Sequence, residues 1–295
     1  NVPEAHRKMI WHLDTPPDST LMSSWHTFQL VKQTGIKVTL DGQGADEQLA
    51  GYLFYLPHRL HGYGFSDLGR QFSALLAKHP TRVALGALFL AGAARLAPSI
   101  VGTFLHPRHK LRMEDVRRGA NWALRRDCGM NLANLIHYAD RTSMAFSVES
   151  RMPFLDFRLA EFLAKVPECY KIHNGWTKAI ARDAFAGKIP DEVVWRKDKL
   201  GWPIPEEQWS NGPLRGWFER SLDARGRNLD ALMAARTEPM VRAGSIAQKV
   251  RVMNLFAWLD TYGSGDWRQF ESGAASVECT GTKVIDSQPP AGIPA

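Results

Sequence analysis

Apolar and polar positions along the chain predict many helices and a single strand. Ile36–Leu40 alternates between the two classes and is rich in β-branched side chains, which is typical of a strand. No other segment shows this pattern convincingly, and a lone strand does not make a sheet. The fold is therefore either almost entirely helical, or its remaining strands lie before residue 1.

Helical periodicity dominates the rest of the chain, with prolines at several of the breaks. The most apolar run, Val83–Ala94, is shorter than the roughly 20 residues that cross a bilayer, so we expect a buried helix and no membrane association. Glu149 and Arg151, two residues apart, would face different partners on a helix. Pro3–His12 is expected to be a short helix or a connector. The predicted helices are Thr20–Thr34, Ser66–Lys78, Thr81–Leu96, Glu114–Arg126, one beginning at Asn131 and ending before Pro153, Phe157–Val166, Gly175–Ala186, Pro213–Leu222, Leu229–Arg236 and Ser245–Tyr262.

The predicted strand runs into Asp41-Gly-Gln-Gly-Ala-Asp-Glu and then a short helix, 45–49. Gly42 and Gly44 favour a tight turn, because glycine adopts positive φ without steric cost. Backbone N–H groups at a helix start suit a phosphate, and Asp46 and Glu47 stand where the helix dipole favours negative charge. Two carboxylates repel a bare phosphate, so the segment suits a phosphate held through a divalent cation. The alternative is an acidic turn that only connects two elements.

Three blocks of the sequence carry longer motifs. They are residues 41–47 with Gly51-Tyr52, then Asp140-Arg-Thr-Ser-Met-Ala-Phe-Ser-Val-Glu-Ser-Arg-Met-Pro-Phe-Leu-Asp, then Trp195-Arg-Lys-Asp-Lys-Leu-Gly-Trp-Pro. The first block is not the dinucleotide fingerprint, because its glycine pattern ends in Glu47. In this order the blocks resemble Ser-Gly-Glu-Gly-x-Asp-Glu…Gly-Gly-Tyr, Asp-Arg-x-Ser-Met-Ala-x-x-x-Glu-x-Arg-x-Pro-Phe-Leu-Asp and Arg-x-x-Lys-x-Gly-Phe/Trp…Pro of glutamine-dependent asparagine synthetases.

The resemblance implies an α/β fold that is mostly helical over this chain. It would be the C-terminal part of an adenine-nucleotide α-hydrolase-like domain (PP-loop ATP pyrophosphatase), with a parallel sheet and a large helical portion. Residues 1–272 would form this domain, without the family's Ser-Gly-Gly-x-Asp-Ser pyrophosphate-loop strand and N-terminal glutaminase domain. The small, polar and proline-containing segment 273–295 is expected to be a disordered tail.

The resemblance also implies roles for individual residues. Asp46 would hold Mg²⁺ on the phosphates of ATP, and Lys199 would stabilise the pentavalent phosphorus and the departing pyrophosphate. Glu47 would orient the amino-acid substrate or its neighbours. Lys178 and Arg182, at i and i+4, would share one helix face, as in the family's Lys-x-x-Leu-Arg segment. The implied nucleotide- and cofactor-binding residues are Asp41, Gly42, Gly44 and Asp46, and Gly51 serves backbone fit.

The implied reaction is the ATP-dependent amidation of a carboxylate, aspartate in the parent family, through an acyl-adenylate, with ammonia from glutamine. Two residues depart from the family, which has serine at Asp41 and glutamate at Gln43. That glutamate is tied to adenylate formation and to deprotonating the attacking ammonium, and a glutamine is no base at neutral pH. Either Asp41 supplies the carboxylate, or the acceptor is not free aspartate, as in a tailoring amidotransferase acting on a sugar or peptide.

Two further hypotheses stay open: a non-catalytic helical interaction domain, and a different pyrophosphatase-loop enzyme such as a β-lactam-forming one. An intact Lys199 loop argues against the first. Because the pyrophosphate loop and the leading cysteine nucleophile of the family are absent, we expect this polypeptide alone to be inactive.

Composition and charge limit the kinds of molecule that the chain is expected to bind. The net charge of +7 and a pI near 9.4 suit an anionic partner such as ATP. Basic clusters lack the interleaved aromatic residues of a nucleic-acid groove, so no nucleic acid is expected. Three scattered cysteines predict a reducing, cytoplasmic location, and a homodimer through the full-length protein is a further expectation. Scattered histidines without ligand spacing predict surface or loop roles: His58, His61, His106 and His109.

Overall fold

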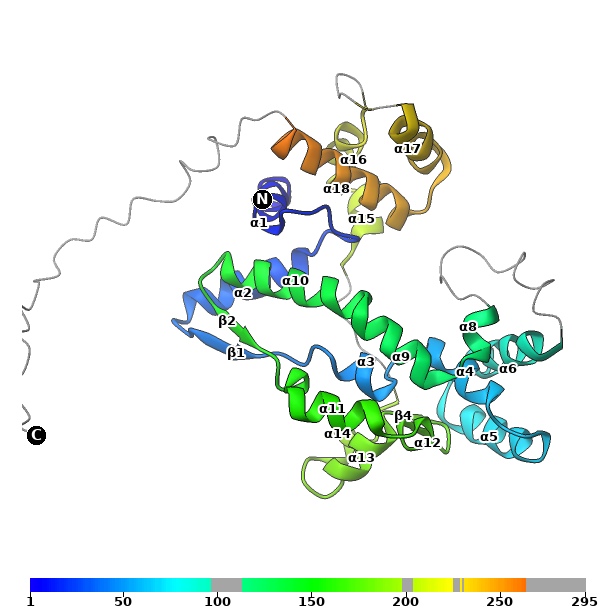
Figure 1. The fold of residues 1–295 in the computed structure, drawn as a ribbon. Coiled ribbons are helices and arrows are strands. Elements are labelled where there is room, and N and C mark those ends of the chain that lie inside the picture. Colours follow the sequence, from blue (N-terminus) through cyan, green and yellow to red (C-terminus); the bar gives the residue numbers. More distant parts are fainter. Residues whose placement is uncertain (97–112, 198–203, 225–228, 230, 264–295) are drawn as a thin grey trace, which may run out of the picture.

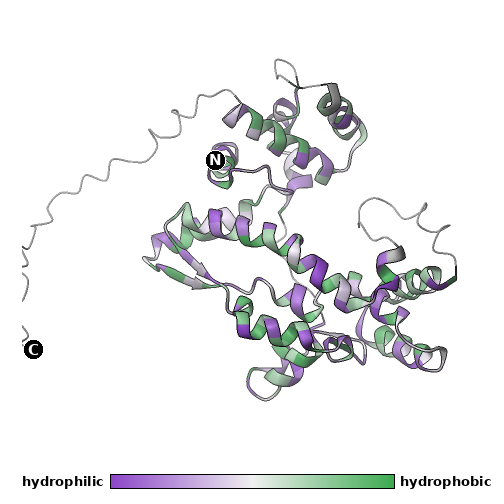
Figure 2. Ribbon diagram, viewed as in Figure 1, coloured by the Kyte–Doolittle hydropathy of each residue, from purple (hydrophilic) through white to green (hydrophobic). Residues whose placement is uncertain are grey.

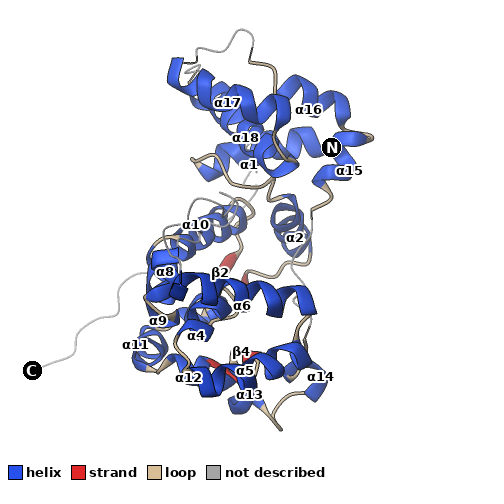
Figure 3. Ribbon diagram, turned by 90° about the vertical axis from the view of Figure 1, so that its right-hand side faces the viewer, coloured by secondary structure: helices blue, strands red, loops and turns tan. Residues whose placement is uncertain are grey.

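The helix α10 (Asn131–Met144) contacts α1, α2, α9 and β2 (Figure 1). The computed structural model describes residues 1–96, 113–197, 204–224, 229 and 231–263. Strands are few and short within these residues (Figure 3). The other helices are α1 (Val2–Leu13), α2 (Met22–Gln33), α3 (Ala45–Leu49), α4 (Leu56–His61), α5 (Phe65–Lys78), α6 (Thr81–Leu96), α8 (Met113–Arg117), α9 (Ala120–Gly129), α11 (Phe157–Lys165), α12 (Glu168–Lys171), α13 (Ala179–Phe185), α14 (Asp191–Val194), α15 (Glu206–Asn211), α16 (Arg215–Ser221), α17 (Ala231–Ala243) and α18 (Ile246–Tyr262), with 3₁₀ turns η1 (Leu53–Tyr55) and η3 (Pro153–Leu155).

The predicted strand is present as β1 (Val38–Leu40) and pairs in parallel with β2 (Glu149–Arg151). A second sheet joins β3 (Ile172–His173) to β4 (Trp176–Thr177) in an antiparallel hairpin. The prediction of one strand in the chain was therefore wrong. β2 was missed because its three residues, Glu-Ser-Arg, are polar and lack β-branched side chains, so only pairing with β1 makes them a strand.

Pairing as a strand also changes the contact between Glu149 and Arg151. Residues two apart on a strand point to the same face. Arg151 Nε accordingly donates to Glu149 Oε1 at 2.8 Å, on the exposed face of β2. The prediction that these two residues face different partners assumed a helix and was wrong.

α6 shows how a very apolar helix can remain half-exposed. It is apolar over most of its length (Figure 2). Its buried face consists of alanines, whereas Leu85 and Phe89 are 51% and 63% exposed. The expected burial therefore holds for one face only. Within the described residues, no helix combines the length and apolarity that a membrane span requires.

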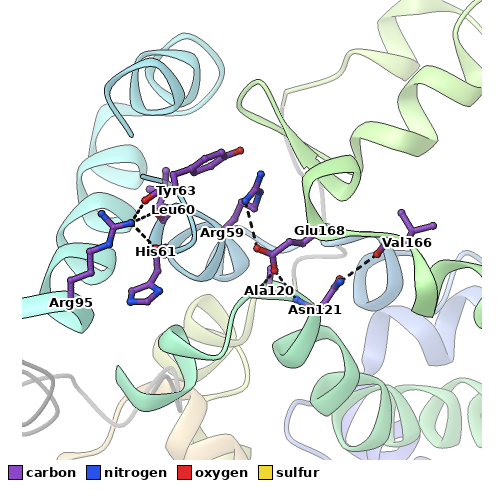
Figure 4. A network of polar contacts seen from close by, with 9 residues as sticks. All are labelled: Arg59, Leu60, His61, Tyr63, Arg95, Ala120, Asn121, Val166 and Glu168. Carbon is purple, nitrogen blue, oxygen red and sulfur yellow. Dashed lines mark hydrogen bonds and ion pairs between the residues drawn. The ribbon is translucent and has the colours of Figure 1, made fainter. Parts of the chain in front are cut away.

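The predicted helix Glu114–Arg126 is instead two helices, α8 and α9. Gly119 breaks the helix with a φ of +81°, a conformation that glycine adopts readily. The N–H groups of Ala120 and Asn121 at the start of α9 donate to the Glu168 carboxylate, at 2.6 and 3.1 Å (Figure 4). Arg59 lies 3.6 Å from the same carboxylate, which ties α4, α9 and α12 together.

Several helix boundaries predicted from the sequence are confirmed. Gly35, with φ +78°, follows the end of α2, and the Asp156 side chain accepts the Arg158 N–H at the start of α11. Ser245 and Gln248 form a capping box at the start of α18. α18 in turn contacts α1, and the Asn254 side chain on it shares a 2.7 Å hydrogen bond with the buried His6 ring.

The histidine prediction was wrong for His58. Its ring is fully buried on α4, and burial together with the nearby Arg126 lowers its pKa to about 4. His106 and His109 lie outside the described residues.

Candidate functional site

The turn between β1 and α3 places the residues that are predicted to contact the nucleotide phosphates at the end of the parallel strand pair. Asp41 N–H donates to Arg151 O at 2.7 Å, which extends the β1–β2 ladder by one residue. Ser150 Oγ lies 3.4 Å from Asp41 Oδ2, so the Asp41 carboxylate is held beside β2. Its position at the carboxyl end of a parallel strand is where ligands of α/β folds bind.

Only one of the two turn glycines needs to be glycine for backbone reasons. Gly44 has φ +87°, and a Cβ there would lie 2.2 Å from Leu155 Cδ2. Gly42 has no positive φ and no neighbour within 4 Å of such a Cβ. The prediction of a conformational role is therefore confirmed for Gly44 and wrong for Gly42. The freedom around Gly42 leaves its backbone approachable from solvent.

Asp46 is paired with a lysine that is 132 positions away along the chain. Lys178 Nζ lies 2.9 Å from Asp46 Oδ1, with the two side chains 32% and 26% exposed. A Cβ on Gly51 would lie 1.7 Å from Asp46 Oδ1 and 2.4 Å from Lys178 Cε, so Gly51 makes room for the pair. This is the backbone fit that the sequence predicted for Gly51.

The link between these segments continues through the backbone. Lys178 N–H donates to Leu49 O at 3.2 Å, and Lys178 itself has a positive φ of 54° just before α13. Arg182 instead donates to Thr177 O and Val194 O. The prediction that Lys178 and Arg182 share one helix face was wrong, because Lys178 precedes the helix and turns towards α3.

Glu47 is 2% exposed and accepts a 2.6 Å hydrogen bond from Tyr52 Oη. Burial, followed by the hydrogen bond to Glu47, raises the pKa of the Tyr52 hydroxyl. Next to it, the buried Tyr55 donates to Asp127 Oδ2 at 2.7 Å, and burial also raises the pKa of Tyr55. Both hydroxyls are therefore hydrogen-bond donors across the physiological pH range, and they fix the carboxylates of α3 and α9.

The third sequence block is only partly described. The ring centroid of Trp195 lies 5.5 Å from that of Trp176 on β4, with the ring planes at 53°. Lys199 lies outside the described residues, so its meeting with Asp46 stays a prediction. Trp209 on α15 packs against two apolar clusters, one that includes Met9 and Leu13 of α1 and one that includes Val250 and Met253 of α18.

The arrangement suits a cation bound partly by phosphate oxygens. No group of three or more acidic, histidine or cysteine side chains is arranged as a metal site within the described residues. Mg²⁺ commonly takes one or two protein carboxylates plus phosphates and waters, and the partly exposed Asp46 carboxylate fits that donor set. Gln43, half-buried in the same turn, offers an amide in place of an acid.

Sequence reasoning missed the two partners that define this site, Lys178 for Asp46 and Tyr52 for Glu47. No spacing rule could place Lys178 there, because the contact depends on α13 docking against α3. The Tyr52 contact follows from the left-handed Ala50, φ +59°, which ends α3 and folds the next turn back.

Comparisons with known proteins agree with the motifs. A family model described as "Asparagine synthase" matches residues 1–267. The chain is 27% identical over 242 residues to asparagine synthetase [glutamine-hydrolyzing] 1 of Bacillus subtilis (strain 168), which covers 73% of this chain and 38% of that protein. It is 24% identical over 290 residues to asparagine synthetase B [glutamine-hydrolyzing] of Escherichia coli (strain K12), covering 96% of this chain and 40% of that protein. A putative asparagine synthetase [glutamine-hydrolyzing] of Mycobacterium bovis is 28% identical over 282 residues, covering 85% and 43%. The chain thus spans about two fifths of the length of these relatives.

Proposed function

Since this chain belongs to the asparagine synthase family, we propose that it forms the synthetase part of a glutamine-dependent enzyme that amidates a carboxylate with ATP. The observation that carries the proposal is the Asp41–Glu47 turn, which sets Asp46 and its partner Lys178 beside the end of the parallel strand pair. At this place the Asp46 carboxylate can bind a cation that carries phosphate, and the Lys178 ammonium can attract an anionic phosphate or carboxylate.

In the proposed reaction, an oxygen of the substrate carboxylate attacks the α-phosphorus of ATP. The bond from that phosphorus to the bridging oxygen breaks, and pyrophosphate leaves. Ammonia derived from glutamine then attacks the acyl carbon, the nitrogen releases one proton to a nearby base or to solvent, the carbon–oxygen bond breaks, and AMP departs with that oxygen. The carboxylate needs this activation because its own oxygen is a poor leaving group.

The chain's residues take the following parts in this proposal. Asp46 holds Mg²⁺, which neutralises charge on the phosphates when it is bound. Lys199 stabilises the charge that develops on the pyrophosphate, and Lys178, displaced from Asp46, is a second cation within reach of the same anions. The Asp41-Gly42 backbone contacts the nucleotide. Glu47, fixed by Tyr52, orients groups next to the acceptor.

We also propose that β1 and β2 belong to a larger parallel sheet of the PP-loop type, within a domain of residues 1–272. Val38 and Leu40 of β1 are 39% and 77% exposed, which is unusual for a strand of a parallel sheet, since both faces of such sheets are normally covered. Further strands and helices packed on β1 would cover these side chains.

Gln43 cannot act as a base, so two acceptors are proposed: free aspartate, with Asp41 supplying the missing carboxylate, or a different carboxylate, with no base at this position. The test expresses the chain together with the residues encoded upstream of Asn1 and supplies ATP and amide-¹⁵N glutamine. Formation of AMP and transfer of ¹⁵N to a carboxylate acceptor support amidation, and ¹⁵N-asparagine formed at a rate typical of asparagine synthetases would refute the non-aspartate acceptor. Absence of AMP formation with every acceptor offered, despite binding of ATP, would refute the function itself.

A further inference from the structure

A pocket of about 270 Å³ lies between α3, α9, α11, α12 and the start of α10. Among the described residues, Asp46 and Lys178 do not line it, so it is separate from the cation site proposed above. Its walls are mostly apolar, and three of its leucines are only 3–5% exposed: Leu124, Leu132 and Leu163. A water molecule needs only about 10–15 Å³ of such space, so the pocket has room for an organic molecule. Apolar pockets with a few polar groups are typical small-molecule sites.

Lys171, at the end of α12, lines this pocket and is only 3% exposed. Within the described residues its ammonium group makes no hydrogen bond and no ion pair. Two residues that act on it electrostatically, Cys128 and Arg125, also line the pocket, which places the ammonium group at the pocket wall. Its Nζ is not one of the atoms that lack both a partner and accessible surface, so it keeps a small surface of its own. Lys171 therefore presents an unpaired positive charge to the pocket.

The carboxylate next to Lys171 belongs to Glu168, and it already has other partners. Its Oε2 accepts the N–H groups of Ala120 and Asn121 at 2.6 and 3.1 Å (Figure 4). Its Oε1 lies 3.6 Å from a guanidinium nitrogen of Arg59. Both oxygens of Glu168 thus hold other groups in place, and neither forms an ion pair with Lys171.

Glu47 does not provide the missing partner either. It lines the pocket, but its carboxylate accepts the Tyr52 hydroxyl and is not one of the groups that act on Lys171. Burial lowers the pKa of Lys171, as expected for an ammonium group that has lost water without gaining an anion. One negative charge on a ligand would supply the partner.

We propose that this pocket binds a monocarboxylate with a hydrocarbon chain. The carboxylate lies between Lys171 and the exposed Arg125, and the chain packs on the leucines. One negative charge matches the one buried cation, whereas a phosphate dianion would bring a second charge into apolar surroundings. The inference stands apart from the proposed amidation, because it needs neither ATP nor Asp46.

Cys128 reports whether the pocket is occupied. Its thiol lines the pocket and interacts electrostatically with Lys171, whereas Cys169 does not line the pocket. The chain is treated with N-ethylmaleimide at neutral pH, and modification of the peptides that contain Cys128 and Cys169 is followed by mass spectrometry. Burial raises the pKa of Cys128, so its modification is slow and long time courses are used. The first probe is octanoate, below the concentration at which it forms micelles.

Octanoate at about ten times its Kd should slow the modification of Cys128 about tenfold and leave that of Cys169 unchanged. Octan-1-ol has the same chain without the charge, and it should bind more weakly by about tenfold or more. In the series butanoate, hexanoate and octanoate, the affinity should rise about fourfold per methylene group, because each methylene is buried against the leucines.

Lys171→Met keeps the length of the side chain and removes its charge. In this variant octanoate should protect Cys128 no better than octan-1-ol does. The matched control is Lys165→Met, which replaces an exposed lysine of α11 outside the pocket lining and should keep the tenfold protection. The ligand series on the unmodified chain keeps the test decisive even if Lys171→Met folds poorly.

Four results would overturn the proposal or one of its parts. No slowing at Cys128 by octanoate would overturn the proposal itself, and equal slowing at Cys169 would do so by showing a general effect of an amphiphile. Equal protection by octan-1-ol would overturn the pairing with Lys171. Tighter binding of octyl phosphate than of octanoate would overturn the single negative charge.

Discussion

The Asp46–Lys178 pair predicts that removing the lysine exposes a stronger cation site. In the structure Lys178 Nζ occupies Asp46 Oδ1 at 2.9 Å, so a divalent cation that binds this carboxylate must displace the ammonium group. Lys178→Met keeps the length of the side chain and removes its charge. We therefore expect Lys178→Met to bind a divalent cation at Asp46 more tightly than the unmodified chain does.

The size of this effect follows from the strength of the pair. The two side chains are 32% and 26% exposed, so water screens them substantially but not completely. Exposed ion pairs contribute about 0.2–1 kcal/mol, and this partly buried pair belongs near the upper end, at about 1 kcal/mol. That energy corresponds to about a fivefold change in an equilibrium constant. Removing the ammonium group also lowers the electrostatic repulsion between the site and the divalent cation, which further increases the affinity for the cation.

Mn²⁺ is a suitable probe, because it takes the same oxygen ligands as Mg²⁺ and its free concentration is read by electron paramagnetic resonance. Titrations compare the unmodified chain, Lys178→Met, Asp46→Asn and the double variant. The increase in Mn²⁺ affinity caused by Lys178→Met should disappear when Asp46 is also replaced by Asn. The Asp46→Asn titration measures the weak Mn²⁺ binding at other carboxylates, so that it can be subtracted. Equal Mn²⁺ affinity with and without Lys178 would refute the competition, and an unchanged gain without Asp46 would show that the cation binds elsewhere.

Two further predictions concern stability. Tyr55→Phe removes the buried donor to Asp127 and should lower the free energy of unfolding by about 1.5–3 kcal/mol, measured by urea titration. Tyr170→Phe changes a tyrosine that is 60% exposed and should alter the free energy of unfolding little. Equal effects of the two substitutions would contradict the assigned hydrogen bond. His58 has a pKa of about 4 in the fold and about 6.5 unfolded, so its contribution is present above pH 6.5 and is lost as pH falls towards 4. His58→Leu should flatten the fall in stability over that range, by up to about 3 kcal/mol, and an unchanged slope in this variant would contradict the assignment.

Local features were predictable where the sequence itself determines them. The α3 boundaries, the capping Asp156 and the left-handed Gly35 follow from glycine, capping and apolar spacing within a few residues. The turn 41–47 was recognised for the same reason, since both its chemistry and its geometry lie in one contiguous segment.

Features that depend on distant segments escaped prediction. β2 exists because Glu149–Arg151 pairs with β1, more than a hundred residues earlier. Lys178 reaches Asp46 because α13 packs on α3. Periodicity reports which face of an element is apolar and carries no information on which element covers it.

The most direct test of the central claim is ATP–pyrophosphate exchange by the chain expressed with the residues encoded upstream of Asn1. The account predicts acceptor-dependent exchange that falls about 100-fold or more in Asp46→Asn and in Lys199→Met, and that persists in Arg158→Gln, whose side chain is exposed and pairs with Asp156. It also predicts no exchange by residues 1–295 alone. Exchange at full rate in both the Asp46 and Lys199 variants would contradict it.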